Sequence, residues 1–128
     1  MKNTDKITKK ILIVEDDEDF ISILKIKFTS SGFSVVVASN GKEGIIKTGE
    51  EKPDLIISDV LMPGMDGLEM AKKIRETNKI VPIVFLTNIK DAAYTNDIQK
   101  SGEFDYLVKS DLRLDDIIDR VKTKLSLT

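Results

Sequence analysis

Acidic, hydroxyl and basic side chains stand at the ends of four short apolar runs of the chain. Glu15 and Asp16 follow the first run, Asp59 the second, Thr87 the third and Lys109 the fourth. Short apolar runs separated by helical stretches are typical of buried parallel strands. Because ligands of an open parallel sheet bind outside the carboxyl ends of its strands, we expect these side chains to meet at one edge. Carboxylates, a hydroxyl and an ammonium suit a divalent cation together with an oxyanion such as a phosphoryl group.

The elements that must position these side chains alternate regularly. We expect strands at 10–14, 33–37, 54–58, 82–86 and 105–108, and helices at 18–30, 42–50, 67–76, 91–101 and 112–125. Gly32 is expected to end the first helix as its C′ residue, and Asn40-Gly41 indicates a turn, in which Gly41 can adopt a positive φ. Alternation at these lengths predicts an α/β fold with a five-stranded parallel sheet and helices on both faces.

Composition excludes several classes of function. The chain has 128 residues, a net charge of −2, no cysteine and no histidine. Disulfides, thiolate catalysis, histidine-ligated metals and a phosphohistidine-donor role are therefore excluded. The small net charge does not suggest binding to nucleic acid or membrane. No apolar run approaches the length of a membrane span or the core of a signal peptide, so we expect a cytoplasmic protein.

The chemistry follows from the carboxylates Glu15, Asp16 and Asp59. Converging carboxylates repel one another unless a cation neutralises them, and an oxygen-only ligand set suits Mg²⁺. An aspartate can also act as a nucleophile and form an aspartyl-phosphate. Taken singly, these residues have ordinary explanations, since Asp17 or Glu18 can cap a helix and Asp59 can be a solvated loop residue. Their joint placement favours phosphoryl transfer.

The chain resembles the receiver domain of two-component response regulators over residues 10–126, with residues 1–9 as a flexible tail. The resemblance rests on the stretches ILIVEDD, PDLIISDVLMPGMDG, IVFLT and GEFDYLVK, which begin at residues 11, 53, 83 and 102. It implies a flavodoxin-like doubly wound (βα)5 sandwich with strand order 2-1-3-4-5. It also implies a switch that takes a phosphoryl group from a histidine kinase in a Mg²⁺-dependent reaction. Such a domain catalyses its own phosphorylation and dephosphorylation, and we expect no turnover of an external substrate.

The resemblance assigns two groups of site residues. Those assigned to Mg²⁺ are Glu15, Asp16, Asp59 and the main-chain carbonyl of Leu61. Those assigned to phosphoryl transfer and switching are the phosphoacceptor Asp59, Lys109, the switch hydroxyl Thr87 and the switch aromatic Tyr106.

The chain departs from the family pattern beside this site. Ser110 replaces the usual proline after the lysine, and a cis bond before a non-proline residue costs about 3–4 kcal/mol. We therefore expect the loop that positions Lys109 to differ. Asn88 is larger than the usual residue after the switch threonine. Leu61 and Ile89 are apolar and cannot orient a water, so we expect a long-lived phosphorylated state.

Partner surfaces are expected on two faces. The first helix carries Leu24 and Phe28 as core residues, together with an offset stripe that the resemblance assigns to docking of a histidine kinase or phosphotransfer protein: Asp19, Phe20, Ile23, Ile26 and Lys27. The alternative is a wide core stripe. The face of helix 4, strand 5 and helix 5 is expected to serve a downstream protein or a homodimer. We expect no direct contact with nucleic acid or membrane.

Three alternatives remain open from the sequence. The chain reads as a stand-alone receiver, similar to chemotaxis regulators, or as one domain of a longer protein. It can also be a receiver-like binding module that works without phosphorylation, for which Ser110 and Asn88 are the hints. A Mg²⁺-dependent hydrolase with an aspartyl nucleophile needs a second acid-base carboxylate, which Val60 and Leu61 do not supply.

Overall fold

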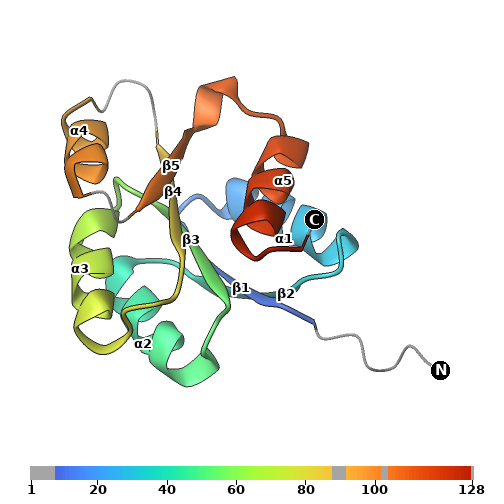
Figure 1. Cartoon of the computed structure of the whole chain (residues 1–128), viewed down its shortest axis with the longest axis horizontal. Helices are drawn as coiled ribbons and strands as arrows, with labels where there is room; N and C mark the ends of the chain where they lie inside the picture. The colour runs from blue at the N-terminus through green and yellow to red at the C-terminus, as the bar shows by residue number, and fades with distance from the viewer. Residues whose placement is uncertain (1–7, 88–91, 102–103, 128) are drawn as a thin grey trace.

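Within the part of the chain that the structure describes, five strands and five long helices alternate (Figure 1). The computed structural model describes residues 8–87, 92–101 and 104–127. The strands are β1 Lys10–Val14, β2 Ser34–Ala38, β3 Leu55–Asp59, β4 Ile83–Thr87 and β5 Asp105–Val108. The helices are α1 Glu18–Ser30, α2 Gly41–Glu51, α3 Gly67–Thr77, α4 Ala92–Ser101 and α5 Leu114–Lys124, and a 3-10 turn, η2 Lys109–Asp111, precedes α5.

The strands form one parallel sheet in the order β2-β1-β3-β4-β5. This confirms the predicted doubly wound α/β fold and its strand order. Parallel neighbours require a crossover, and each crossover here is a helix that covers one face of the sheet. The carboxyl ends of all five strands therefore meet at one edge.

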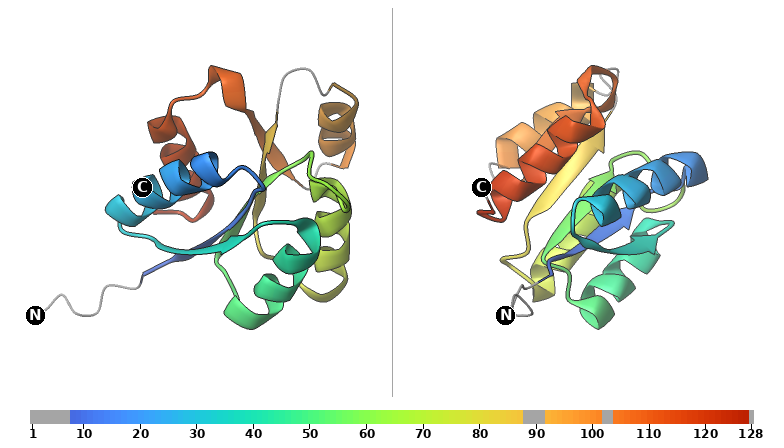
Figure 2. Two further views of the ribbon diagram at one scale, coloured as in Figure 1. Left: turned by 180° about the vertical axis from the view of Figure 1, so that it is seen from behind. Right: turned by 90° about the vertical axis from the view of Figure 1, so that its right-hand side faces the viewer.

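Each face of the sheet has its own apolar core, because successive strand residues point to opposite faces. In β1, Ile11 and Ile13 pack with Leu24 and Phe28 of α1 and with buried residues of α5. Leu12 and Val14 pack instead with buried residues of α3 and α4. Figure 2 shows the result, with α1 and α5 on one face and α2, α3 and α4 on the other.

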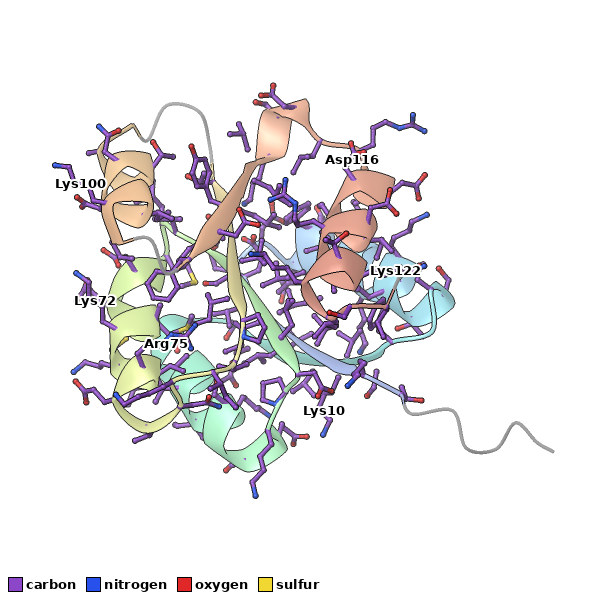
Figure 3. The ribbon with its side chains drawn as sticks, viewed as in Figure 1. Lys10, Lys72, Arg75, Lys100, Asp116 and Lys122 are labelled. Atoms are coloured by element: carbon purple, nitrogen blue, oxygen red, sulfur yellow. The ribbon has the colours of Figure 1, made fainter. Side chains whose placement is uncertain are left out.

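Charged side chains lie on the outer surfaces of the helices. Lys72 of α3 and Lys100 of α4 point away from the sheet (Figure 3). Arg75 lies over the Phe104 ring, 5.3 Å from its centroid. At the amino ends of the strands, the Lys10 Nζ lies 3.1 Å from Glu51 Oε1. No helix within the described ranges has the length and apolarity that a membrane crossing requires.

The bounds of β1, α1 and β5 agree with the predictions. β2, β3 and β4 each lie one residue later than expected, so Asp59 and Thr87 are the last residues of their strands. For β2 the reason is the end of α1, where Gly32 has φ +96° and the Phe33 N–H donates to the Phe28 carbonyl. This Schellman motif keeps Phe33 out of the strand.

Two local predictions were wrong. Gly41 does not adopt a positive φ; it is the first residue of α2, and the Asn40 side chain caps that helix. A Cβ on Gly41 would crowd Met65, which explains glycine there. Helix α5 begins at Leu114 rather than at residue 112, because η2 occupies the preceding residues. The predicted flexibility of residues 1–9 falls mainly on residues outside the described ranges.

Candidate functional site

Three carboxylates meet at the carboxyl edge of the sheet. β1 and β3 are neighbours, and their register pairs Val14 with Ser58. The next residues, Glu15 and Asp59, are therefore adjacent, and Asp16 joins them at the start of the loop. Each of the three acids offers a carboxylate oxygen that lies within 4.8 Å of the others'.

Lys109 extends into this cluster from the end of β5. Its Nζ lies 3.2 Å from Glu15 Oε1 and 3.2 Å from Asp59 Oδ2. β5 is separated from β3 by β4, so a long side chain is needed to reach Asp59. The Lys109–Ser110 bond is trans, as are all peptide bonds of the described residues, and Ser110 lies inside the 3-10 turn η2. The Lys109 ammonium therefore lies beside the carboxylates where the sequence led us to expect it. The residues that follow it form a 3-10 turn with a trans bond.

Burial and neighbouring charges shift the pKa values of Glu15 and Lys109. Burial raises the pKa of Glu15, and repulsion from Asp59 raises it further, while Lys109 opposes the rise. Burial alone would lower the pKa of Lys109, but the Asp59 and Glu15 carboxylates outweigh that effect and raise it. The lysine is therefore held as an ammonium that neutralises part of the acidic cluster.

The backbone fixes Asp59 from several directions. The Val60 N–H donates to Asp59 Oδ1 at 2.8 Å, and the Ser58 hydroxyl donates to the Asp59 carbonyl at 2.7 Å. The Gly67 N–H donates to the Val60 carbonyl at 2.7 Å, which closes the loop onto the start of α3. A Cβ on Gly67 would clash with the Asp59 carbonyl. Sequence reasoning missed Ser58 and Gly67, although the Asp66-Gly67 pair at the start of a helix was a signal.

The three acidic residues that follow β1, Glu15, Asp16 and Asp17, make different contacts. Glu15 is almost fully buried, and its Oε2 accepts from the backbone N–H groups of Asp16 and Asp17 at 3.2 Å. The Asp17 side chain caps α1 by accepting from the N–H groups of Asp19 and Phe20. The capping alternative is thus correct for Asp17, and Asp16 remains exposed beside the other two acids.

Thr87 and Tyr106 lie at different distances from the acidic edge. Asp59 pairs with Leu86 in the sheet, so the buried Thr87 lies one residue beyond that pair, at the end of β4. Tyr106 is half-buried, pairs with Phe85 and packs against the core on the α3 face. Leu61 is exposed two residues after Asp59. Asn88 and Ile89 fall outside the described residues.

The α1 stripe is largely exposed. Leu24 and Phe28 are buried, as predicted, whereas Ile23 is 47% exposed and Ile26 is 70% exposed. A wide core stripe therefore does not explain Ile23 and Ile26. Asp19 is exposed, and Phe20 is half-buried.

The remaining basic residue of the stripe, Lys27, is paired. Its Nζ lies 2.5 Å from Asp115 Oδ1, which joins α1 to α5 and lowers the pKa of Asp115. A similar surface pair lies on β5 and α5, where Arg120 Nη1 is 2.6 Å from Asp105 Oδ2. Burial alone would raise the pKa of Asp105, but the hydrogen bond and charge of Arg120 lower it.

Comparison with known proteins agrees with this geometry. Residues 11–122 match the family described as response regulator receiver domain. The chain belongs to this receiver family. The alkaline phosphatase synthesis transcriptional regulatory protein PhoP of Bacillus subtilis is 36% identical over 114 residues, which cover 89% of this chain and 43% of PhoP. The transcriptional regulatory protein AfsQ1 of Streptomyces coelicolor is 37% identical over 99 residues, covering 77% of this chain and 44% of AfsQ1.

Solved structures resemble the receiver domain over nearly its whole length. A two-component response regulator from Clostridium difficile is 34% identical with a TM-score of 0.84, and the match covers 93% of this chain and 97% of that one. The chemotaxis response regulator CheY4 of Vibrio cholerae is 27% identical with a TM-score of 0.83, covering 92% and 99%. The receiver domain thus spans less than half the length of PhoP and AfsQ1, and nearly all of CheY4.

Proposed function

We propose that this receiver domain, residues 10–126, is a phosphoacceptor switch in which Asp59 takes a phosphoryl group from a histidine kinase or a phosphotransfer protein. The observation that carries the proposal is the Lys109 ammonium, which lies 3.2 Å from an oxygen of Asp59 and from one of Glu15. A cation held against a nucleophilic carboxylate at the carboxyl edge of a parallel sheet suits phosphoryl transfer.

The reaction requires Asp59 to act as the nucleophile. One carboxylate oxygen attacks phosphorus, the bond from phosphorus to the donor breaks, and its electron pair leaves with the donor group. A phosphohistidine donor then leaves as a neutral imidazole after taking up a proton from solvent. Lys109 is placed to bind a phosphoryl oxygen as charge moves from the donor to Asp59. In hydrolysis, water attacks phosphorus, the bond from phosphorus to the Asp59 oxygen breaks, and inorganic phosphate leaves the resting carboxylate behind.

The acidic cluster fits Mg²⁺. Its donors are oxygens, three carboxylates converge within 4.8 Å, and Asp16 is exposed enough to leave room for water ligands. Mg²⁺ prefers such oxygen donors and keeps several waters. We propose that Glu15, Asp16, Asp59 and the Leu61 carbonyl hold it, and that it neutralises phosphoryl oxygens when bound.

The signal is proposed to pass from Thr87 to Tyr106. A phosphoryl group on Asp59 carries a charge of about −1.5 to −2 in place of the single negative charge of the carboxylate, and it has new acceptor oxygens that the Thr87 hydroxyl can approach. A beryllofluoride mimic should then shift amide resonances at Tyr106 and along α4. Shifts confined to the Asp59 loop would refute the coupling. We propose that the α4-β5-α5 face binds a downstream protein or a second copy of the chain. The exposed stripe of α1 would bind a histidine kinase in the cytoplasm.

The test is incubation with Mg²⁺ and acetyl phosphate or phosphoramidate, followed by intact mass. One added phosphoryl group on the wild type, and none on Asp59→Asn, is the expected result, because an amide forms no acyl phosphate. No adduct on the wild type would favour the phosphorylation-independent binding module. Turnover of external phosphoesters would favour the hydrolase. A full adduct on Asp59→Asn would place the nucleophile elsewhere.

A further inference from the structure

An aromatic ring lies beneath the lysine of the proposed site. The Lys109 Nζ is 4.9 Å from the centroid of the Phe20 ring, within the range of a cation–π interaction. Phe20 is half-buried and packs against the core formed with α1 and α5. Its backbone N–H donates to the Asp17 cap at 3.2 Å. The ring is therefore anchored by its own helix and by the core below it.

The other restraints attract the Lys109 ammonium without fixing its position closely. Its bonds to Glu15 and Asp59 are both 3.2 Å, at the long end of the usual range for N–H···O. The next residue is the exposed Ser110, which restricts the backbone less than a proline. A lysine side chain also loses considerable rotamer freedom when it is held in one place. The face of the Phe20 ring adds a further attraction for the ammonium.

We propose that Phe20 is a positioning residue for Lys109, whose ring holds the ammonium against Glu15 and Asp59. This inference rests on the proposed phosphoryl transfer to Asp59. It gives Phe20 a role at the site, separate from the docking role that the helix stripe suggested. An exposed cation–π contact changes an equilibrium by about two- to fivefold, which sets the size of the effect.

The first experiment compares substitutions that keep or remove the ring. Phe20→Leu and Phe20→Met keep an apolar side chain but remove the aromatic face, so we expect autophosphorylation from acetyl phosphate to slow by about two- to fivefold. Affinity for beryllofluoride should fall by a similar factor. Phe20→Tyr keeps the ring and should restore both. Equal rates for wild type and Phe20→Leu, or a tyrosine variant as slow as the leucine variant, would overturn the positioning role.

Phe33→Leu is the matched control. Phe33 belongs to the same core but precedes β2, at the opposite edge of the sheet from Lys109. This variant also loses an aromatic ring from the core, so its thermal stability should fall while its phosphorylation rate stays at the wild-type value. A rate lowered as much as in Phe20→Leu would attribute the effect to general destabilisation and overturn the inference.

A second readout needs no phosphorylation. Protons next to the Lys109 ammonium lie over a ring face, so their NMR signals should be shifted upfield in the wild type and in Phe20→Tyr. The shift should disappear in Phe20→Leu, and its absence from the wild type would overturn the contact itself. No adduct on the wild type would overturn the proposed function together with this inference. An adduct formed at equal rates would overturn only the role of Phe20.

Discussion

Removing the cation from the acidic cluster should destabilise the domain and increase its dependence on Mg²⁺. Lys109→Met keeps the length and apolar stem of the side chain but deletes the charge. Glu15 has only 3% of its side chain exposed and Asp59 has 14%, so both would lose a partner at 3.2 Å with little water to replace it. Two nearly buried carboxylates would then face each other.

The magnitude follows from these distances and exposures. Two unit charges 3.2 Å apart attract by about 5 kcal/mol at an effective dielectric constant of 20. Much of that attraction is offset by the cost of removing the ammonium from water, and loss of one partner of a fully buried pair costs about 3–5 kcal/mol. The Lys109 side chain is 22% exposed. We therefore expect Lys109→Met to lower the free energy of unfolding by about 2–3 kcal/mol at pH 7 without metal.

The assay is urea unfolding with and without Mg²⁺. Metal that binds the folded state stabilises it by mass action, and a cluster without its lysine should bind Mg²⁺ more tightly. The deficit of Lys109→Met should therefore shrink as Mg²⁺ is added. Lys10→Met is the matched control, because Lys10 pairs with Glu51 at 3.1 Å but both side chains are about one-third exposed. It should cost less than about 1 kcal/mol and be insensitive to metal.

The pH dependence gives a second check. Burial, followed by repulsion from Asp59, raises the pKa of Glu15, and loss of Lys109 removes an opposing effect. An acid with a raised pKa binds protons more tightly in the folded state, so stability falls as the pH rises above the unfolded value near 4.3. Lowering the pH from 7 towards 5 should therefore reduce the difference in free energy of unfolding between Lys109→Met and the wild type. A gap that is constant with both pH and Mg²⁺ would refute the idea that Lys109 neutralises the acidic cluster.

The remaining predictions concern the metal, the loop and a surface pair. Asp16→Ala should abolish Mg²⁺ binding in a calorimetric titration, and unchanged affinity would place the metal elsewhere. Gly67→Ala should cost about 1–3 kcal/mol in urea unfolding, because the new Cβ clashes with the Asp59 carbonyl, whereas Gly49→Ala in open space on α2 should stabilise the domain by about 0.5–1 kcal/mol. Equal effects would contradict the packing argument. Asp105→Asn should lose less than about 1 kcal/mol at pH 7. Because its basic partners lower the Asp105 pKa, that difference should fade as the pH drops below about 4, and a difference that persists would exclude the ion pair.

Strand periodicity and connection lengths were enough to predict the sheet and its acidic edge. Four buried runs end in polar residues, and parallel topology places those ends together whatever the side chains between them do. The register of β1 and β3 then makes Glu15 and Asp59 neighbours. Family resemblance supplied the strand order and the roles of Thr87 and Tyr106, which spacing alone does not specify.

Features that depend on three-dimensional packing were harder to predict. Asn40-Gly41 has the composition of a turn, yet Asn40 caps α2, and the close approach of Met65 favours glycine at the next position. Phe20 has helical spacing with the exposed stripe of α1, but its ring lies under Lys109, 89 residues later in the chain. Such a contact depends on how the sheet places α1 relative to β5, so a local sequence pattern cannot predict it.

Charge balance connects the metal to phosphoryl transfer at this edge. When ionised, Glu15, Asp16 and Asp59 carry three negative charges, and Lys109 returns one positive charge, which leaves two negative charges in the cluster. A divalent cation cancels them. Without it, a donor phosphoryl group with a charge of about −1.5 to −2 would have to enter an already negative site, so Glu15 and Asp16 would oppose the phosphorylation of Asp59. Lys109 therefore neutralises only part of the acidic cluster and is insufficient to accept the phosphoryl charge as well, which is why the proposed reaction requires Mg²⁺.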